Sequence, residues 1–146
     1  MFVGLLSAAV AITLTVVGWE LTRRLRRRDQ ERADLTEVDR LLRRLGVRIR
    51  LLDDQDDVLT AASEDCRTLR SLKYELSGVD LPALPEVGTV LGAVVDRLDA
   101  FLGTALPSHP AGTGTLTQAR QQGRAAQEVL SAVDDAQDVV GRLRVR

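Results

Sequence analysis

Few residues of this chain have side chains that could act as nucleophiles, metal ligands or proton carriers. There is one cysteine, Cys66, and one histidine, His109, so the sequence allows no intramolecular disulfide and no cluster of Cys and His ligands. Ser108 precedes His109, but a catalytic triad also needs an orienting acid in the right geometry. Cys66 lies beside Leu69 on an apolar helical face, which predicts a small buried side chain. We therefore expect no catalytic residue, no cofactor site and no enzyme.

The densest group of acidic residues is the one place where a metal site could be considered. Asp53 to Glu64 spans twelve residues, the length of an EF-hand loop, but Val58 stands where that loop needs glycine. We therefore expect no metal site. Such an acidic run is usually a solvated helix face or a turn, and it could also pair with the arginines of residues 40–50 in a neighbouring chain.

An uncharged stretch at the start of the chain is predicted to hold the rest of the protein at a membrane. Phe2 to Trp19 is eighteen residues without a charge, or about 27 Å of helix against a hydrocarbon core of about 30 Å. Trp19 ends the stretch, where an aromatic ring favours the membrane interface. Residues 1–22 are thus predicted to be a single-pass transmembrane anchor. A cleaved signal peptide fits less well, because there is no basic n-region and arginines follow directly. A buried core helix is the third interpretation.

Five arginines follow the anchor within the segment 23–33. They are Arg23, Arg24, Arg26, Arg27 and Arg28. The positive-inside rule then predicts that the N-terminus lies outside and the remainder in the cytoplasm, at the plasma membrane. The same arginines could bind anionic lipid headgroups. We expect no nucleic-acid binding, because no aromatic residues are interleaved with them.

Small residues fall on one face of the predicted anchor. Gly4, Ala8, Ala11, Thr15 and Gly18 are spaced by 4, 3, 4 and 3 residues. A face of this kind lets two helices approach closely in lipid, although such residues are also common in membrane helices generally. Association through this face and chance spacing both remain open.

Residues 34–146 are predicted to form a cytoplasmic all-α domain of three to four amphipathic helices, either a helical bundle or a coiled-coil-like structure. The expected helices cover about 34–78, starting at the capping-box sequence Asp34–Glu37, and then 86–106 and 115–145. The first helix could be continuous or could break near residues 53–57. The chain has only four aromatic residues, so its core must come from Leu, Val and Ala, which favours helix packing.

Three apolar seams with alternating steps of three and four residues support these helices. The first seam consists of Leu35, Val38, Leu42, Leu45, Ile49 and Leu52. The second consists of Val87, Leu91, Val94, Leu98 and Phe101. The third consists of Leu116, Ala119, Gly123, Ala126, Leu130, Val133 and Val140, and its small first half predicts close packing against a neighbour.

Charge is distributed unevenly although the net charge is only −1. Residues 20–50 carry a net charge of +5, and residues 51–110 carry −7. Nearly all basic residues are arginine, which indicates a GC-rich bacterial genome. These features favour a membrane-anchored interaction or scaffold protein, whose partners are membrane lipid and either a second copy or another helical protein. A signalling or regulatory accessory of another membrane protein and a small lysis or toxin-type protein are the alternatives.

Overall fold

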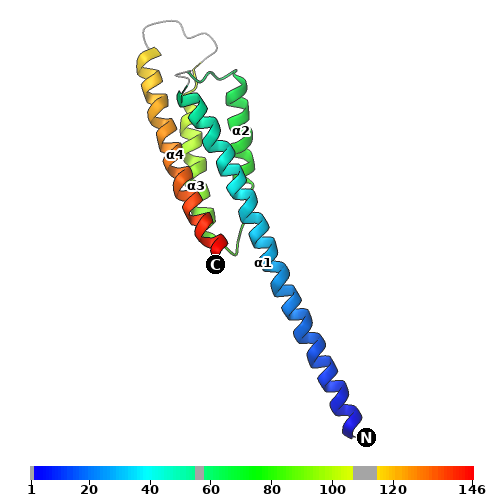
Figure 1. Cartoon of the computed structure of the whole chain (residues 1–146). Coiled ribbons are helices and arrows are strands. Elements are labelled where there is room, and N and C mark those ends of the chain that lie inside the picture. The colour runs from blue at the N-terminus through cyan, green and yellow to red at the C-terminus, as the bar shows by residue number, and fades with distance from the viewer. Residues whose placement is uncertain (1, 55–57, 107–114) are drawn as a thin grey trace. The chain divides into compact units, whose positions relative to one another are not determined.

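The described residues of the protein form four α-helices, whose arrangement Figure 1 shows. The computed structural model describes residues 2–54, 58–106 and 115–146, and it describes side chains except for those of residues 2–6 and 115. The helices are α1 (Phe2–Asp54), α2 (Glu64–Ser77), α3 (Pro85–Gly103) and α4 (Thr115–Val145), and these described residues contain no strand. The prediction of an all-α helical bundle is confirmed.

The chain divides into two compact units. The N-terminal unit is residues 1–34 and contains the first part of α1. The second unit, residues 35–146, contains the rest of α1 with α2, α3 and α4, and we call it the bundle.

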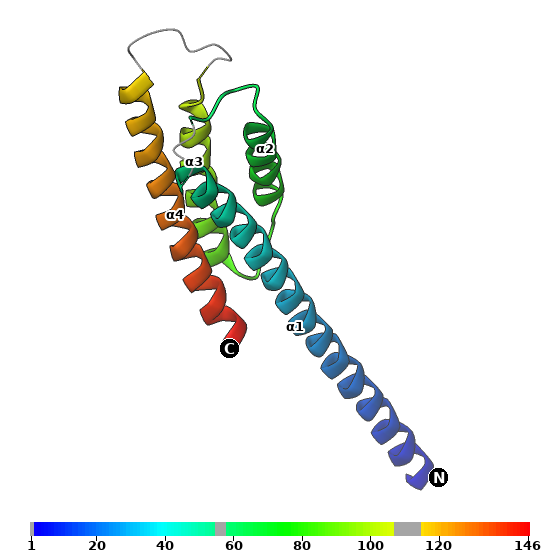
Figure 2. The same ribbon diagram turned by 45° about the horizontal axis from the view of Figure 1, so that its top comes forward.

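Four helical segments run side by side in the bundle with alternating direction (Figures 1 and 2). Ion pairs identify the neighbours. Arg48 of α1 pairs with Asp65 of α2 at 3.4 Å, and Lys73 of α2 pairs with Asp99 of α3 at 2.9 Å. On the other side Arg97 of α3 pairs with Glu128 of α4 at 2.9 Å, and Arg50 of α1 lies 3.7 Å from Asp134 of α4. The order around the bundle is therefore α1, α2, α3, α4, so that α1 and α3 lie diagonally opposite.

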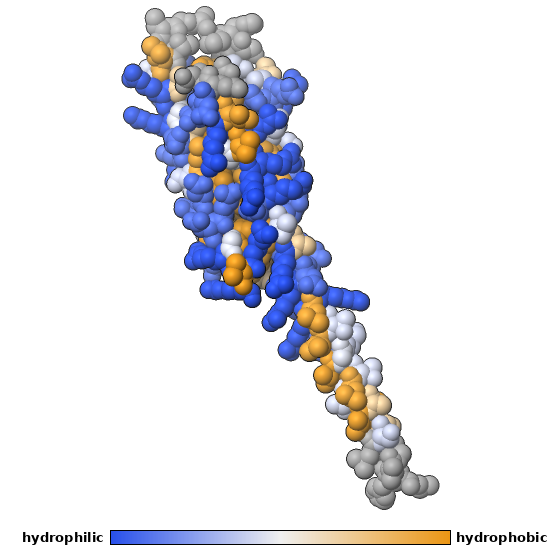
Figure 3. All heavy atoms as spheres, in the orientation of Figure 1, coloured by the Kyte–Doolittle hydropathy of each residue, from blue (hydrophilic) through white to orange (hydrophobic). Residues whose placement is uncertain are grey.

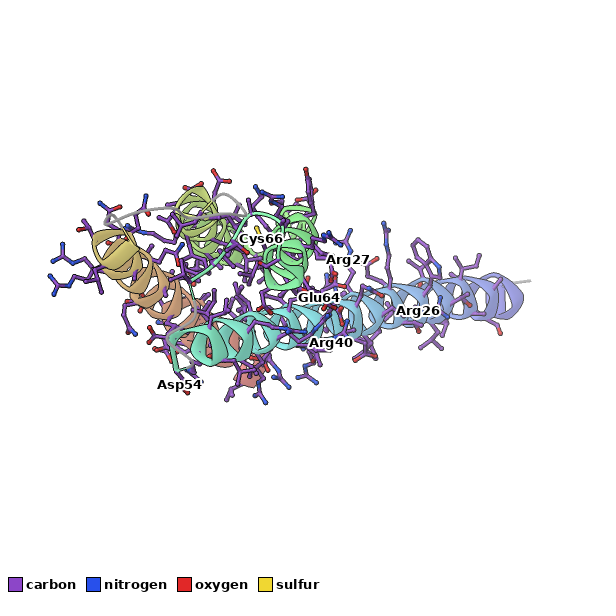
Figure 4. All side chains as sticks on the ribbon, turned by 90° about the horizontal axis from the view of Figure 1, so that it is seen from above. Arg26, Arg27, Arg40, Asp54, Glu64 and Cys66 are labelled. Carbon is purple, nitrogen blue, oxygen red and sulfur yellow. The ribbon has the colours of Figure 1, made fainter. Side chains whose placement is uncertain are left out.

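The core is built almost entirely from aliphatic side chains. Every residue of the first and second predicted seams is buried, and α2 adds Cys66, Leu69, Leu72 and Leu76. Figure 4 labels Cys66, whose exposed fraction is 0%, so the prediction of a buried cysteine is confirmed. Because Leu, Val and Ile lose little hydrogen bonding on burial, their removal from water is the main stabilising term of the bundle.

The buried face of α4 differs from the predicted one. Its buried residues are Gln122, Ala126, Val129, Val133, Ala136 and Val140, with steps of 4, 3, 4, 3 and 4. Leu130 is only partly buried, and Leu116 is 75% exposed. The prediction is right for Ala126, Val133 and Val140, and it is wrong elsewhere because it preferred leucine to valine and glycine to a polar residue. The close packing expected at Gly123 is also absent, since a Cβ there would meet no described atom within 4 Å.

One helix boundary also differs from the expectation. The sequence Asp34–Glu37 does not start a helix, because α1 continues through it. No glycine or proline occurs between residues 19 and 45, so nothing interrupts the backbone hydrogen bonds there, and the Asp34 carboxylate accepts a hydrogen bond from Gln30 at 3.1 Å.

At its other end α1 stops at Asp54, and α2 begins at Glu64. The Ser63 hydroxyl caps α2 by accepting a hydrogen bond from the Cys66 amide at 3.2 Å. Two carboxylates, Glu64 and Asp65, follow in the first turn, where the helix dipole favours negative charge. The long helix therefore breaks at the acidic run.

Candidate functional site

The N-terminal unit leaves large apolar side chains uncovered. Figure 3 shows hydrophobic residues along this part of α1. Those exposed by more than half are Val10, Ile12, Leu14, Val16, Val17, Trp19, Leu21 and Leu25. Soluble monomers rarely expose an apolar patch of this kind, which makes this surface the main candidate for a functional role.

The threonine hydroxyls of the N-terminal unit are satisfied within the helix. Thr13, Thr15 and Thr22 each donate to the carbonyl oxygen four residues earlier, at 2.7, 2.8 and 2.8 Å. A hydroxyl bonded in this way does not require water. These polar side chains are therefore compatible with an apolar environment.

A charged segment follows the apolar one on the same helix. All five predicted arginines are exposed, and Figure 4 shows Arg26 and Arg27 projecting from α1. The Arg23 guanidinium carbon lies 5.4 Å from the centre of the Trp19 ring, within range of a cation–π interaction. Arg24 forms an ion pair of 3.4 Å with Glu20. This pair involves one of the five arginines, and the charge of the cluster stays positive because the other four remain.

The predicted small-residue face is open in the described residues. Ala8, Ala11, Thr15 and Gly18 are all exposed, and a Cβ built on Gly18 would meet nothing within 4 Å. The exposure of Gly4, the first residue of this face, lies outside what the structure describes.

We predicted that residues 1–22 cross a membrane. Within the part of the chain that the structure describes, no helix has a segment long and apolar enough to do so. The side chains of Met1 to Leu6, which begin the predicted anchor, lie outside that part.

Gln122 is the buried polar residue that sequence reasoning missed. Its side-chain oxygen accepts a hydrogen bond from the Leu59 amide at 2.9 Å. Its side-chain nitrogen donates to the carbonyl oxygens of Leu59 and Thr104, at 3.1 and 2.8 Å. The Leu106 amide also donates to the Leu59 carbonyl at 2.9 Å. Gln122 therefore joins the segments before α2 and after α3 at one end of the bundle, and its place in the 4, 3 spacing of α4 was the available signal.

The described acidic residues between Asp53 and Glu64 are not gathered with other side chains that could bind a metal ion. Asp53 accepts a hydrogen bond from Gln127 at 2.8 Å. Among the described residues, no group of three His, Cys, Asp or Glu side chains could hold a metal ion. Residues 55–57, Ser108 and His109 lie outside the described residues.

Four of the five arginines of residues 40–50 form ion pairs within the same chain, and Arg44 is the exception among the described pairs. Arg48 and Arg50 pair with Asp65 and Asp134, and Arg40 donates to Glu37 at 3.0 Å. The hydrogen bond from Arg40 holds the pKa of Glu37 below its ordinary value. The pairs of Arg48 and Arg50 join α1 to α2 and to α4, whereas the pair of Arg40 lies within α1.

Comparisons with family models, with curated proteins and with solved structures find no match to this chain. The features of the described residues that bear on function are the exposed apolar surface, the arginines beside it and the surface of the bundle.

Proposed function

We propose that this chain is a single-pass membrane protein that presents its helical bundle to other helical proteins. Residues 1–22 embed in the plasma membrane with the N-terminus outside, and the bundle lies in the cytoplasm. The bundle acts by helix–helix association, either with a second copy or with another membrane or cytoplasmic protein.

The exposed apolar side chains of the N-terminal unit carry this proposal. Eight large apolar side chains there are each more than half exposed. Full burial of one such side chain is worth roughly 1.5–3 kcal/mol, so transferring all eight from their half-exposed state into lipid gains of the order of 10 kcal/mol. The hydrogen bonds within the helix remove the cost of burying the threonine hydroxyls.

The arginines support the proposed orientation. Five of them follow the apolar segment within six residues, from Arg23 to Arg28. Each basic residue close to an anionic membrane surface contributes about 1 kcal/mol, and such a cluster resists translocation. The cluster therefore favours the cytoplasmic side for everything that follows it.

Extraction with alkaline carbonate tests the anchor. We expect the full chain to stay with the membrane pellet. In a double variant, Val10→Arg with Leu14→Arg, each arginine near the bilayer centre costs about 2.5–3.5 kcal/mol, so the chain should move into the supernatant. The matched control adds two arginines to the exposed bundle positions Ser77 and Ala83 and should stay in the pellet.

Protease accessibility tests the orientation. Protease added outside intact cells should leave the bundle undigested, and lysis should expose it. Recovery of the unmodified chain in the carbonate supernatant would overturn the anchor, and digestion of the bundle from outside would overturn the orientation.

A further inference from the structure

The outer face of α1 in the bundle carries two exposed apolar side chains, of which Val47 also borders a hollow lined by Thr68 and Leu72 of α2. Val47 is 53% exposed and Leu51 is 48% exposed, one helical turn apart on the side opposite the buried Leu45 and Ile49. The exposed arginine Arg44 stands beside them on the same face, one turn before Val47 and Arg48. We call Val47, Leu51 and Arg44 the α1 ridge.

A groove of matching character lies between α3 and α4. It has a volume of about 330 Å³, and its floor consists of the small or short side chains of Val90, Ala93 and Ala132. Asp135 lines one part of it, and the ion pair of Arg97 with Glu128 lines another. We call this the α3/α4 groove. It is large enough for one or two aliphatic side chains.

The ridge and the groove carry opposite charges, although the charge of Arg44 also acts, after that of Arg40, on the nearby Glu37 carboxylate. Among the described residues, Arg44 forms no ion pair, and Asp135 forms none either. Their neighbours Arg48, Arg50 and Glu128 are already paired. An arginine beside an apolar ridge and an aspartate beside an apolar groove are electrostatically complementary.

The ridge and the groove also lie at the same level along the bundle. Val133 of α4 stands 3.7 Å from the position that a Cβ of Gly46 would occupy. Arg50 of α1 reaches Asp134 of α4 at 3.7 Å. Residues 46–50 are therefore level with residues 133–134, which belong to the same turns of α4 as Ala132 and Asp135.

A single chain cannot bring its own ridge into its own groove. α1 and α3 lie diagonally opposite, so the outer face of α1 points away from the groove between α3 and α4. A second copy can supply the missing half with little shift along the bundle axis.

We propose that the α1 ridge of one copy docks into the α3/α4 groove of a second copy, with Arg44 facing Asp135. This contact is heterologous, because each copy uses a different surface, and it therefore continues from copy to copy in a ring or row. The inference rests on the proposed interaction role of the bundle and names its partner as this same chain. Anchoring in one membrane raises the local concentration of copies and favours such a contact.

Cysteine cross-linking of the full chain in its membrane tests the contact. One copy carries Val47→Cys and a differently tagged copy carries Ala132→Cys. We expect a disulfide-linked dimer when the two are co-expressed and oxidised, and none when either is expressed alone. The unmodified chain is the control, because its Cys66 is buried. A Val47→Cys chain that cross-links to itself would show a symmetric contact and overturn the proposal, as would a mixture that does not cross-link.

A charge exchange supplies the specificity test. Arg44→Glu or Asp135→Arg, placed in the relevant copy, should lower the cross-linked fraction about tenfold, and the two together should restore it. The control Arg70→Glu changes an exposed charge on α2 and should leave the yield unchanged. Carbonate extraction of the same samples separates the two proposals. A pelleted chain without cross-links refutes the docking contact alone, and a cross-linked chain in the supernatant refutes the anchor alone.

Discussion

Replacing Gln122 by leucine should destabilise the bundle although leucine is the more hydrophobic residue. The substitution removes three hydrogen bonds, those to the Leu59 amide, the Leu59 carbonyl and the Thr104 carbonyl. The Leu59 carbonyl keeps its bond from Leu106, so two backbone groups lose their partner. A buried group without a partner costs about 1–3 kcal/mol. Since Leu59 is buried and Thr104 only partly so, we expect a loss of about 2–4 kcal/mol.

Gln122→Ala should destabilise the bundle less than the loss of a hydrogen-bond partner at the buried Leu59 amide would suggest. The space beside Gln122 is already partly open, with Leu52, Phe101 and Gly123 around it. Removing the side chain enlarges that space, so water can enter and bond the freed amide. The leucine variant excludes this water, and it should be at least as destabilised as the alanine variant.

Urea unfolding of the full chain in mild detergent, followed by circular dichroism, measures these changes. Gln121→Leu is the matched control, because Gln121 is exposed, and it should stay within about 0.5 kcal/mol of the unmodified chain. Hydrogen exchange at the Leu59 amide should accelerate in Gln122→Leu. A leucine variant as stable as the unmodified chain, with a protected Leu59 amide, would refute the argument.

Three further outcomes are expected. Ile49→Ala should lower the free energy of unfolding by about 2–5 kcal/mol because Ile49 is fully buried, whereas Leu51→Ala should change it little; equal effects would contradict the assigned core. Ser63→Ala should cost about 1 kcal/mol by removing the cap of α2, and Ser63→Asp should restore most of it in the same urea assay. Replacing Arg26, Arg27 and Arg28 by Gln should weaken co-sedimentation with vesicles containing phosphatidylserine but not with neutral vesicles; equal loss on both would argue against headgroup binding.

Helix periodicity was the reliable signal in this sequence. The spacing of Leu and Val from Leu35 to Leu52 and from Val87 to Phe101 matches the buried residues of the bundle. Long apolar seams are informative because burial requires side chains on one face at steps of three and four residues. The break after Asp54 was one of two alternatives, and the choice between them depends on tertiary contacts that spacing does not contain.

The sequence-based predictions fail at positions where the type of a residue suggests one role and its place on the helix gives it another. On α4, Val129 is buried and Leu130 is only partly so, because the phase of the helix decides burial and not the size of the side chain. Gln122 was missed because a polar residue on a core face is favourable only when specific partners exist, here from segments about twenty and sixty residues away. The capping sequence at Asp34 was misread because a local motif cannot start a helix that is already running.

The packing of α1 against α4 has a consequence for how the chain is made. The Asp39 carboxylate lies 3.4 Å from Arg144, a contact that joins residues 105 positions apart. Ribosomes release the chain from its N-terminus, so the apolar face of α1 emerges long before α4 exists to cover it. Contacts between such distant residues form late in folding and leave apolar surface exposed meanwhile. The part of the α1 face that α4 covers therefore stays exposed on the nascent chain until α4 has left the ribosome.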